Sequence, residues 1–251
     1  MNAADTAARS ATHGLRDRIE ALDWASLLGQ LDGEGHALTG PLLAPEECAA
    51  LTALYADDTR FRKRIVMERY RYGVGDYAYF AHPLPPVVAT LRETLYGRLA
   101  PLANGWAARL ARSGAPQLPY PATLAAYLER CHAAGQQRPT PLLLRYAAGG
   151  YNCLHQDLYG SEAFPVQATC FLSRAGTDYR GGEFLLVEQR PRQQSRGTAL
   201  SPVQGAVLLF ASAARPVPGK RGVLRAHMRH GVSTVSGGNR FTLGIIFHDA
   251  A

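Results

Sequence analysis

In the first half of the chain, apolar residues recur every three or four positions, the spacing that places them on one face of a helix. Asp32-Gly33 ends the first such run. Pro45 begins the second, with two glutamates in its first turn, where they complement the helix dipole. A break is expected at Pro101, because proline cannot donate the hydrogen bond of an interior helical turn. The predicted helices are Leu15–Leu31, Pro45–Tyr55, Val87–Leu110 and Leu124–Cys131.

From Pro141 onward the pattern changes to short apolar or alternating runs separated by glycine and proline, which indicates strands. A run of strands without intervening helices is typical of a double-sheet jelly roll. We therefore predict an α+β chain whose core is a jelly roll, a cupin-like double-stranded β-helix. The predicted strands are Leu142–Tyr146, Tyr151–Asp157, Val166–Ser173, Glu183–Glu188, Thr198–Leu200, Ala206–Ala211, Val223–Val235 (with a break near Gly231) and Arg240–Phe247.

This change of pattern divides the chain into three parts. Residues 1–13 are small and polar without the apolar region of a signal peptide, and a disordered tail is expected there. Residues 14–140 are predicted to form a helical layer and a substrate lid packed on the core, and residues 141–251 the jelly roll. No apolar run approaches the roughly 18 residues that a membrane helix needs, so no membrane association is expected.

Basic residues are unevenly distributed in this chain of net charge +7. The segment Gln189–His248 contains nine lysines and arginines and no acidic residue. An anionic partner such as nucleic acid fits this distribution, and so does a solvated basic surface. The four cysteines are widely spaced and form neither a zinc pattern nor a disulfide framework, which fits a reducing cytoplasm.

The segment Arg60–Phe80 interleaves basic residues with aromatic ones around two glycines. Aromatic rings that stack on bases, beside cations that meet phosphates, predict a lid that faces nucleic acid. The alternative is a β-hairpin whose aromatic residues pack on the core.

A candidate metal site follows the first predicted strand of the jelly roll. The pair Gly149-Gly150 breaks the chain, and the next strand presents His155 and Asp157. Successive side chains of a strand alternate between faces, so these two side chains point the same way and Gln156 points away. An imidazole and a carboxylate are two of the three ligands of a 2-His-1-carboxylate Fe(II) site.

Three downstream histidines are candidates for the third ligand: His227, His230 and His248. His230 is favoured, because a strand, a glycine turn and a second strand bring Arg240 close to it. For His227 the alternative to a metal ligand is a supporting or surface residue. For His248 the alternative is a histidine near the end of the chain whose hydrogen bonds are satisfied within the protein.

Arg240 and Thr242 occupy alternate positions of the last strand. A buried arginine is costly unless an anion meets it. A dicarboxylate cosubstrate gripped by Arg240 with help from Thr242 would supply that anion, and an internal Asp or Glu is the alternative. The other face of this strand is apolar: Phe241, Leu243, Ile245 and Phe247.

His155-Gln-Asp157, His230 and Arg240-Phe-Thr242 together resemble the 2-oxoglutarate/Fe(II)-dependent dioxygenase superfamily, over about residues 141–249. Two further segments are similar to prolyl-hydroxylase-like members: Gly181-Gly182-Glu183 and Gly205–Phe210.

Arg145-Tyr146-Ala147, followed by Gly149 and by Leu154–Asp157, is similar to AlkB-type nucleic-acid repair dioxygenases. The whole chain also resembles a bacterial oxygenase family described as acting on damaged DNA. Leu144 stands where AlkB-type enzymes usually have asparagine, and Ile246 where they have a second arginine. These departures favour a substrate other than an alkylated base and leave the iron and cosubstrate assignments unchanged.

The resemblance implies an enzyme that uses Fe(II), 2-oxoglutarate and O2, and its leading function is oxidative demethylation of alkylated nucleic acid. The alternatives are a hydroxylase of a protein side chain or a small molecule, and a cupin-like binding module without enzymatic activity. The implied metal ligands are His155, Asp157 and His230. The implied cosubstrate contacts are Arg240, Thr242 and Tyr146.

Substrate contacts are expected next to the metal motif and in the lid. Cys153 shares the strand face of His155, and either lines the pocket or packs as a small buried residue. The candidate substrate residues are Tyr151, Tyr159 and Glu162 beside the motif, and Tyr77 and Tyr79 in the lid.

Overall fold

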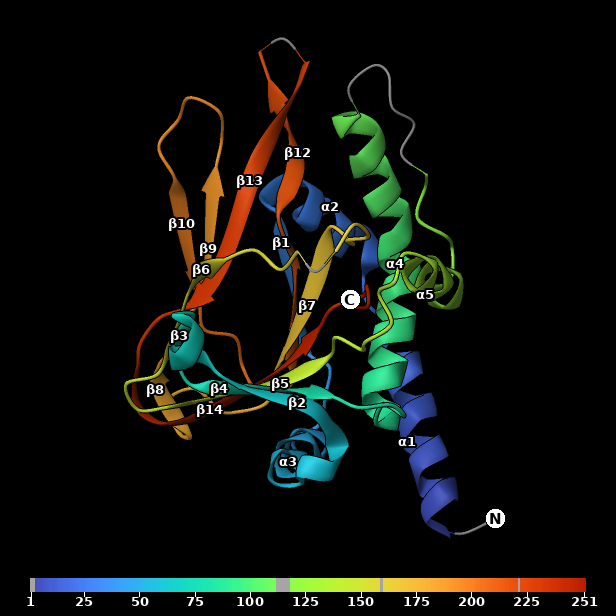
Figure 1. Cartoon of the computed structure of the whole chain (residues 1–251), viewed down its shortest axis with the longest axis vertical. Coiled ribbons are helices and arrows are strands. Elements are labelled where there is room, and N and C mark those ends of the chain that lie inside the picture. Colours follow the sequence, from blue (N-terminus) through green and yellow to red (C-terminus); the bar gives the residue numbers. More distant parts are fainter. Residues whose placement is uncertain (1–2, 112–117, 159, 221) are drawn as a thin grey trace.

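Two antiparallel sheets form the core of the protein, and the long helices α1 (Ala3–Glu20) and α4 (Pro86–Leu110) stand along one side of them (Figure 1). This computed structural model describes residues 3–111, 118–158, 160–220 and 222–251. In these parts of the chain, no helix has the length and apolar character needed to cross a membrane.

The larger sheet has the strand order β1-β11-β7-β14-β5-β4-β2, with β8 paired to β14. The residues that the sequence predicted as the first, third, sixth and eighth jelly-roll strands lie side by side at its centre, in the order β11-β7-β14-β5. The strands of this sheet are β1 (His36–Pro41), β2 (Phe61–Val66), β4 (Asp76–Phe80), β5 (Leu142–Ala147), β7 (Val166–Phe171), β8 (Tyr179–Gly181), β11 (Ala206–Ala211) and β14 (Val235–Ile245).

The smaller sheet has the order β10-β9-β13-β6-β3, with β12 paired to β13. The other four predicted strands occupy β10-β9-β13-β6, so the chain passes between the two sheets as a jelly roll requires and the predicted fold is confirmed. The strands of this sheet are β3 (Gly73–Val74), β6 (Tyr151–His155), β9 (Phe184–Gln189), β10 (Arg196–Leu200), β12 (Ala214–Gly219) and β13 (Gly222–Val232).

Two strands in the jelly-roll region were missed by the sequence pattern, β8 and β12. β8 has three residues, too few for a recognisable alternation. β12 contains Pro216 and Pro218, which argue against a strand. It pairs with β13 alone, and an edge strand tolerates proline because its outer N–H groups need no partner in the sheet.

The helices are α1 (Ala3–Glu20), α2 (Trp24–Glu34), α3 (Pro45–Ala53), α4 (Pro86–Leu110) and α5 (Leu124–Ala133), with short 3-10 turns η1 (Leu54–Ala56), η2 (Asp58–Arg60) and η3 (Met67–Tyr70). The single helix predicted over Leu15–Leu31 is wrong, because α1 and α2 are separate. The Asp23 side chain caps α2 by accepting from the Ser26 N–H (3.0 Å), and the Trp24 indole donates to the Ile19 carbonyl (2.8 Å). α1 already begins at Ala3, inside the segment 1–13 that was predicted to be a disordered tail.

The break predicted at Pro101 is absent, and α4 continues through this residue. Pro101 is exposed, whereas Ala100, Ala103 and Trp106 on neighbouring turns are buried. Packing of these residues on the core maintains the helix although one backbone hydrogen bond is lost.

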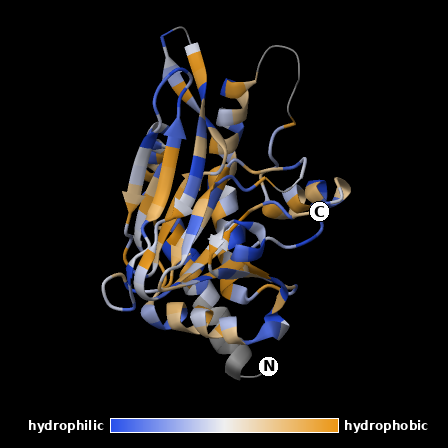
Figure 2. Cartoon of the chain, turned by 60° about the vertical axis from the view of Figure 1, so that its left-hand side comes forward, coloured by the Kyte–Doolittle hydropathy of each residue, from blue (hydrophilic) through white to orange (hydrophobic). Residues whose placement is uncertain are grey.

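The main hydrophobic core lies between the helices and the outer face of the larger sheet. Alternate residues of its central strands face the helices, among them Cys170 and Leu243. The residues between them face the smaller sheet, where Phe171 and Phe210 pack with Phe184. The central strands β7 and β11 are thus buried on both faces, whereas hydrophobic and hydrophilic residues alternate along several other strands (Figure 2). All four cysteines are free.

Candidate active site

Three side chains that could hold a metal ion meet where β6 and β13 pair. His155 ends β6, Asp157 follows it, and His230 is the register partner of His155 on β13. The Asp157 carboxylate lies 3.5 Å from His155 Nε2 and 3.3 Å from His230 Nε2. One potential ligand atom from each residue lies within 4.8 Å of the other two. Two imidazoles and one carboxylate are the ligand set of a mononuclear Fe(II) site.

The hydrogen bond of the His155 ring leaves its Nε2 available to a metal ion. Its Nδ1–H donates to the Cys153 carbonyl (2.8 Å), so the lone pair is on Nε2, which faces Asp157. Burial lowers the pKa of His155, nearby His230 lowers it further, and Asp157 opposes both effects. The imidazole therefore stays neutral at pH 7, which is the form that binds a metal.

His230 is oriented by aromatic packing. Its ring stacks on Phe184 (centroids 5.9 Å apart, planes at 9°) and lies 4.8 Å from the Phe210 ring. Its Nδ1 is buried and has no hydrogen-bond partner among the described residues. The two phenyl rings thus hold the imidazole and keep water from its inner side.

Gln156 points away from its two neighbours, as the alternation predicted. Its amide donates to the carbonyls of Ala213 (2.9 Å) and Met228 (2.7 Å). These bonds fasten the segment between the two ligands to β13 and to the connection before β12.

The two rival histidines lie elsewhere. His227 is exposed on β13, on the face opposite to His230. His248 is buried, and its Nδ1 accepts a hydrogen bond from the Phe164 N–H (3.2 Å). Neither belongs to the group of possible ligands.

Arg240 is 1% exposed, yet its Nε and Nη2 have no hydrogen-bond partner among the described residues. The rings of Tyr146, Phe171 and Tyr179 surround its guanidinium at 5.6, 5.6 and 5.8 Å. Burial lowers its pKa without neutralising it. No carboxylate of the described chain forms an ion pair with Arg240, so the internal partner considered as the alternative is absent there. A buried cation with free donors fits an anionic ligand such as a carboxylate.

A cavity of about 380 Å³ joins the metal group to Arg240. Thr242, 2% exposed, lines it on the same face of β14, and Tyr146 lines it from β5. The Asn152 amide donates to the Tyr146 hydroxyl (3.3 Å) and also lines the cavity. Asn152 was not singled out from the sequence, because its importance depends on the contact between β5 and β6.

The candidate substrate residues separate into two groups. Tyr77 lines the cavity. Tyr79 is buried behind it, with its ring edge-on to Tyr77 (5.4 Å), and does not line the cavity. Tyr151 is 38% exposed on β6 and lies outside the lining, whereas Cys153 is exposed and lines the cavity.

Glu162 lies away from the cavity. Its carboxylate forms an ion pair with Arg130 (2.8 Å), and its backbone is held by the Gln136 side chain. It fixes the chain between β6 and β7 rather than lining the site. Tyr159 lies outside the described residues.

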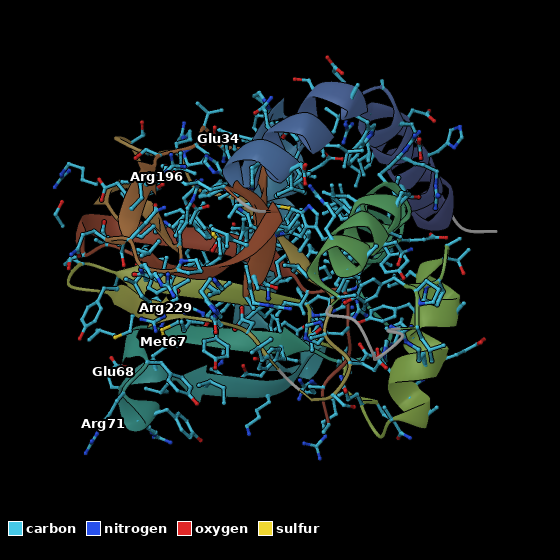
Figure 3. All side chains as sticks on the ribbon, turned by 90° about the horizontal axis from the view of Figure 1, so that it is seen from above. Glu34, Met67, Glu68, Arg71, Arg196 and Arg229 are labelled. Atoms are coloured by element: carbon cyan, nitrogen blue, oxygen red, sulfur yellow. The ribbon has the colours of Figure 1, made fainter. Side chains whose placement is uncertain are left out.

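Arg60–Phe80 forms a β-hairpin with an exposed aromatic turn. β2 and β4 form the β-hairpin of the alternative reading, with Phe61 and Phe80 packed at 4.9 Å. The turn between them exposes Tyr70 and Tyr72, whose rings stack at 5.5 Å with planes at 19°. Arg71 between them has a left-handed backbone (φ 59°), which places both rings on one side, and its side chain projects outward (Figure 3). Tyr72 and Arg71 also line the cavity.

A jelly roll that places a His-Asp-His group and a buried arginine in one cavity defines the class of 2-oxoglutarate/Fe(II) oxygenases. Solved structures share this fold. A prolyl-4-hydroxylase of Pseudomonas putida matches with a TM-score of 0.52 and 13% identity, covering 91% of this chain and 99% of that one. A prolyl hydroxylase of Trichoplax adhaerens, in complex with a hypoxia inducible factor peptide, matches with a TM-score of 0.55 and 14% identity, covering 92% and 90%.

Sequence comparison gives the family. Residues 75–250 match the family Oxygenase-NA, described as an oxygenase catalysing oxidative methylation of damaged DNA. The uncharacterized protein Rv2227 of Mycobacterium tuberculosis is 47% identical over 195 residues, which are 76% of this chain and 82% of that protein. The chain belongs to the Oxygenase-NA family. It is therefore an oxygenase, an enzyme rather than a binding module without activity. Its His-Asp-His group and buried Arg240 are the residues expected of the 2-oxoglutarate/Fe(II) class.

Proposed function

We propose that the protein removes alkyl groups from nucleic acid by oxidative demethylation. The observation that carries this proposal is the stacked pair Tyr70 and Tyr72, of which Tyr72 lines the cavity. Tyr70 and Tyr72 are 51% and 49% exposed, so apolar ring surface is left in contact with solvent. Exposed stacked rings beside an arginine are a platform on which bases of a single strand can stack.

The residues of the cavity fit the cofactors of this reaction. His155, Asp157 and His230 would hold Fe(II), and Arg240 with Thr242 would hold the far carboxylate of 2-oxoglutarate. When bound, Fe(II) and 2-oxoglutarate would supply the oxidation of a substrate C–H bond by O2. An N-methyl carbon oxidised in this way leaves as formaldehyde. The cofactors would supply the chemistry, and the protein binds and orients the reactants, so no acid or base from the protein is required.

Charge on the outer face of the smaller sheet suits a phosphate backbone. Arg225, His227 and Arg229 alternate along β13 and are exposed on the outer face of the smaller sheet. Arg225 and Arg229 form no ion pair within the described chain, whereas Arg196 is paired with Glu34 (3.1 Å; Figure 3). Unpaired arginines on a sheet face can neutralise phosphates and supply sequence-independent affinity.

The alternative substrate is a protein side chain or a small molecule. It is favoured by the apolar wall that Leu142, Leu144 and Ile246 give to the cavity, because an aliphatic group fits such a wall. A substrate of this kind would make no use of Tyr70 and Tyr72 or of the arginines of β13.

The two substrate classes are distinguished by replacing the exposed rings. We expect Tyr72→Ala to weaken binding of single-stranded DNA carrying one N-methylated base by about tenfold, since stacking contributes about 1–3 kcal/mol per base. Tyr151→Ala is the control, since this tyrosine is similarly exposed but lies outside the cavity lining. Fluorescence anisotropy of labelled DNA measures both. Equal affinity of the wild type and both variants would contradict a stacking platform and favour the alternative substrate.

A further inference from the structure

The side-chain amide nitrogen of Gln167 has no hydrogen-bond partner within the described part of the protein. Gln167 lies on the inner face of β7, is 3% exposed and lines the cavity. The amide Nε2 is itself buried. A buried amide without a partner is costly, so such a group in a cavity wall indicates a ligand contact.

Other glutamines of the interior behave differently. The amide of Gln136 donates to the Glu162 and Asp249 carbonyls, and that of Gln204 donates to the Leu172 carbonyl (2.8 Å). Gln156 is satisfied in the same way by two carbonyls. Each of these residues connects two segments of the fold. Gln167 makes no such connection, so a structural function does not account for it.

The position of Gln167 along the barrel separates it from Arg240, the expected anchor of the cosubstrate. Phe171, which contacts Arg240, pairs with Thr242 across the sheet. Gln167 lies four residues further along β7, a rise of roughly 13 Å in a strand. The four C–C bonds of 2-oxoglutarate span at most about 6 Å. The Gln167 amide is therefore beyond the reach of the carboxylate that meets Arg240.

Gln167 instead lies at the level of the metal group. Its register partner on β11 is Phe210, whose ring is 4.8 Å from that of His230. The amide thus faces the part of the cavity next to the metal ligands, from the opposite sheet. A substrate carbon that is oxidised there brings its adjacent atoms to this amide.

We infer that Gln167 recognises the polar edge of the target base. A carboxamide offers a donor and an acceptor in one plane, which matches the paired donor and acceptor of a base edge, and enzymes that act on a flipped base read that edge by hydrogen bonds. The apolar residues Leu144 and Ile246 pack against the ring, and Gln167 sets its orientation. This inference rests on the proposed action on nucleic acid.

The test compares Gln167→Leu with the wild type and with the control Gln204→Leu, which makes the same chemical change outside the cavity. Binding of 2-oxoglutarate is measured without O2, as the absorbance of the Fe(II) complex. Affinity for single-stranded DNA is measured with and without one N-methylated base. We expect Gln167→Leu to reduce the preference for methylated DNA about tenfold, with unchanged 2-oxoglutarate affinity.

Thermal unfolding adds a readout that a structural function would change. Gln167→Leu should keep or raise the Tm, because an unpaired buried amide is replaced by an apolar group, whereas Gln204→Leu should lower it. Weaker 2-oxoglutarate binding, an unchanged preference for methylated DNA or a lower Tm of Gln167→Leu would each overturn the inference and leave the proposed function standing. A wild type that does not distinguish methylated from unmethylated DNA would overturn the proposed function, and the base contact with it.

Discussion

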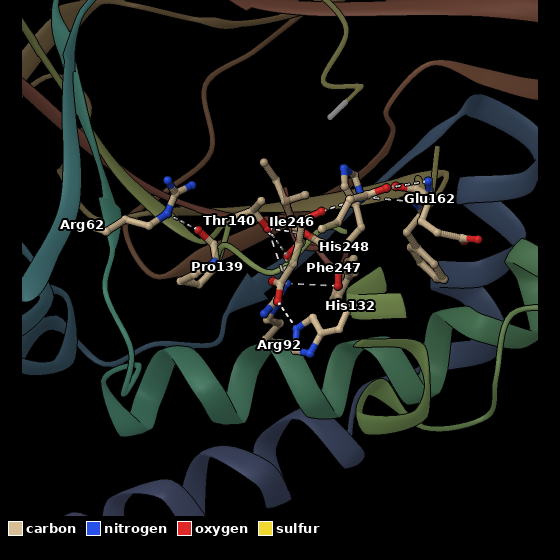
Figure 4. A network of polar contacts seen from close by, with 12 residues as sticks. Arg62, Arg92, His132, Pro139, Thr140, Glu162, Ile246, Phe247 and His248 are labelled. Atoms are coloured by element: carbon tan, nitrogen blue, oxygen red, sulfur yellow. Dashed lines mark hydrogen bonds and ion pairs between the residues drawn. The ribbon is translucent and has the colours of Figure 1, made fainter. Parts of the chain in front are cut away.

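Arg92 of α4 and Asp249, after the last strand, form an ion pair of 2.8 Å although their side chains are only 1% and 0% exposed. Arg92 also donates to the carbonyls of Ile246 (2.9 Å) and Phe247 (3.1 Å) (Figure 4). Asp249 accepts a further bond from His132 of α5 (2.9 Å). This network connects two helices to the end of β14, and so supports the strand that carries Arg240 and Thr242.

Removal of Asp249 should be strongly destabilising. Asp249→Ala leaves Arg92 buried without its partner, which typically costs about 3–5 kcal/mol. The control is Glu93→Ala, which breaks the exposed ion pair with Arg16 and should cost less than about 1 kcal/mol. Urea denaturation gives both free energies of unfolding. Similar losses for the two variants would show that the buried network does not stabilise the fold.

Acid should destabilise the protein through His248. Burial lowers the pKa of this imidazole to about 4, and nearby Arg92 lowers it further. Between pH 6.5 and about 4 the unfolded chain binds a proton that the folded chain does not, so stability is complete above pH 6.5 and falls as the pH is lowered. Protonation of His248 should lower the free energy of unfolding by about 3 kcal/mol in total.

His248→Asn isolates this contribution. The asparagine carbonyl can still accept from the Phe164 N–H but does not titrate, so the free energy of unfolding should depend less on pH between 6.5 and 4. His227→Asn, on the exposed face of β13, should retain the pH dependence of the wild type. The assignment to His248 is wrong if its variant and the wild type lose stability in parallel.

Arg240→Ala should weaken 2-oxoglutarate binding at least about thirtyfold, because truncating one partner of a buried charged pair typically costs about 2–5 kcal/mol. Iron content after loading should be unchanged, since Arg240 is not in the ligand group. Arg229→Ala, on the outer face, serves as the control for the loss of an arginine. Unchanged cosubstrate affinity in Arg240→Ala would refute the assignment of the anchor.

The double variant Arg225→Ala/Arg229→Ala tests the basic face of β13. If both side chains contact phosphates of a single strand, the slope of log affinity against log salt concentration should be smaller in magnitude by about 1.4 in the double variant. Each lost contact accounts for roughly 0.7 of this change. Arg174→Ala removes an arginine that is paired with Asp178 (2.9 Å) and should leave the slope unchanged. An unchanged slope in the double variant would show that the DNA does not contact this face of β13.

The grouping of the candidate metal and cosubstrate residues could be predicted because strand periodicity determines which side chains share a face. His155 and Asp157 share a face by alternation, and so do Arg240 and Thr242, and the structure places all four in one cavity. The eight strands of the jelly roll were predicted for the same reason. Their pattern is local and repeats every two residues.

Other features depend on contacts between distant segments. Glu162 follows the metal motif in sequence, but its carboxylate pairs with Arg130 of α5. Gln167 is an ordinary polar residue in a strand until the structure places its amide in the cavity without a partner. The separation of α1 from α2 likewise depends on the packing and hydrogen bond of Trp24, which helical periodicity does not reveal.

The most direct test of oxidative demethylation is to incubate the protein with Fe(II), 2-oxoglutarate, O2 and single-stranded DNA that carries one N-methylated base. Succinate, formaldehyde and the mass of the DNA are then measured. We expect equal amounts of succinate and formaldehyde and a DNA mass lower by one methyl group, with no turnover in His155→Ala. Succinate formation without any change in the DNA, or no succinate above that of His155→Ala, would contradict the proposed function.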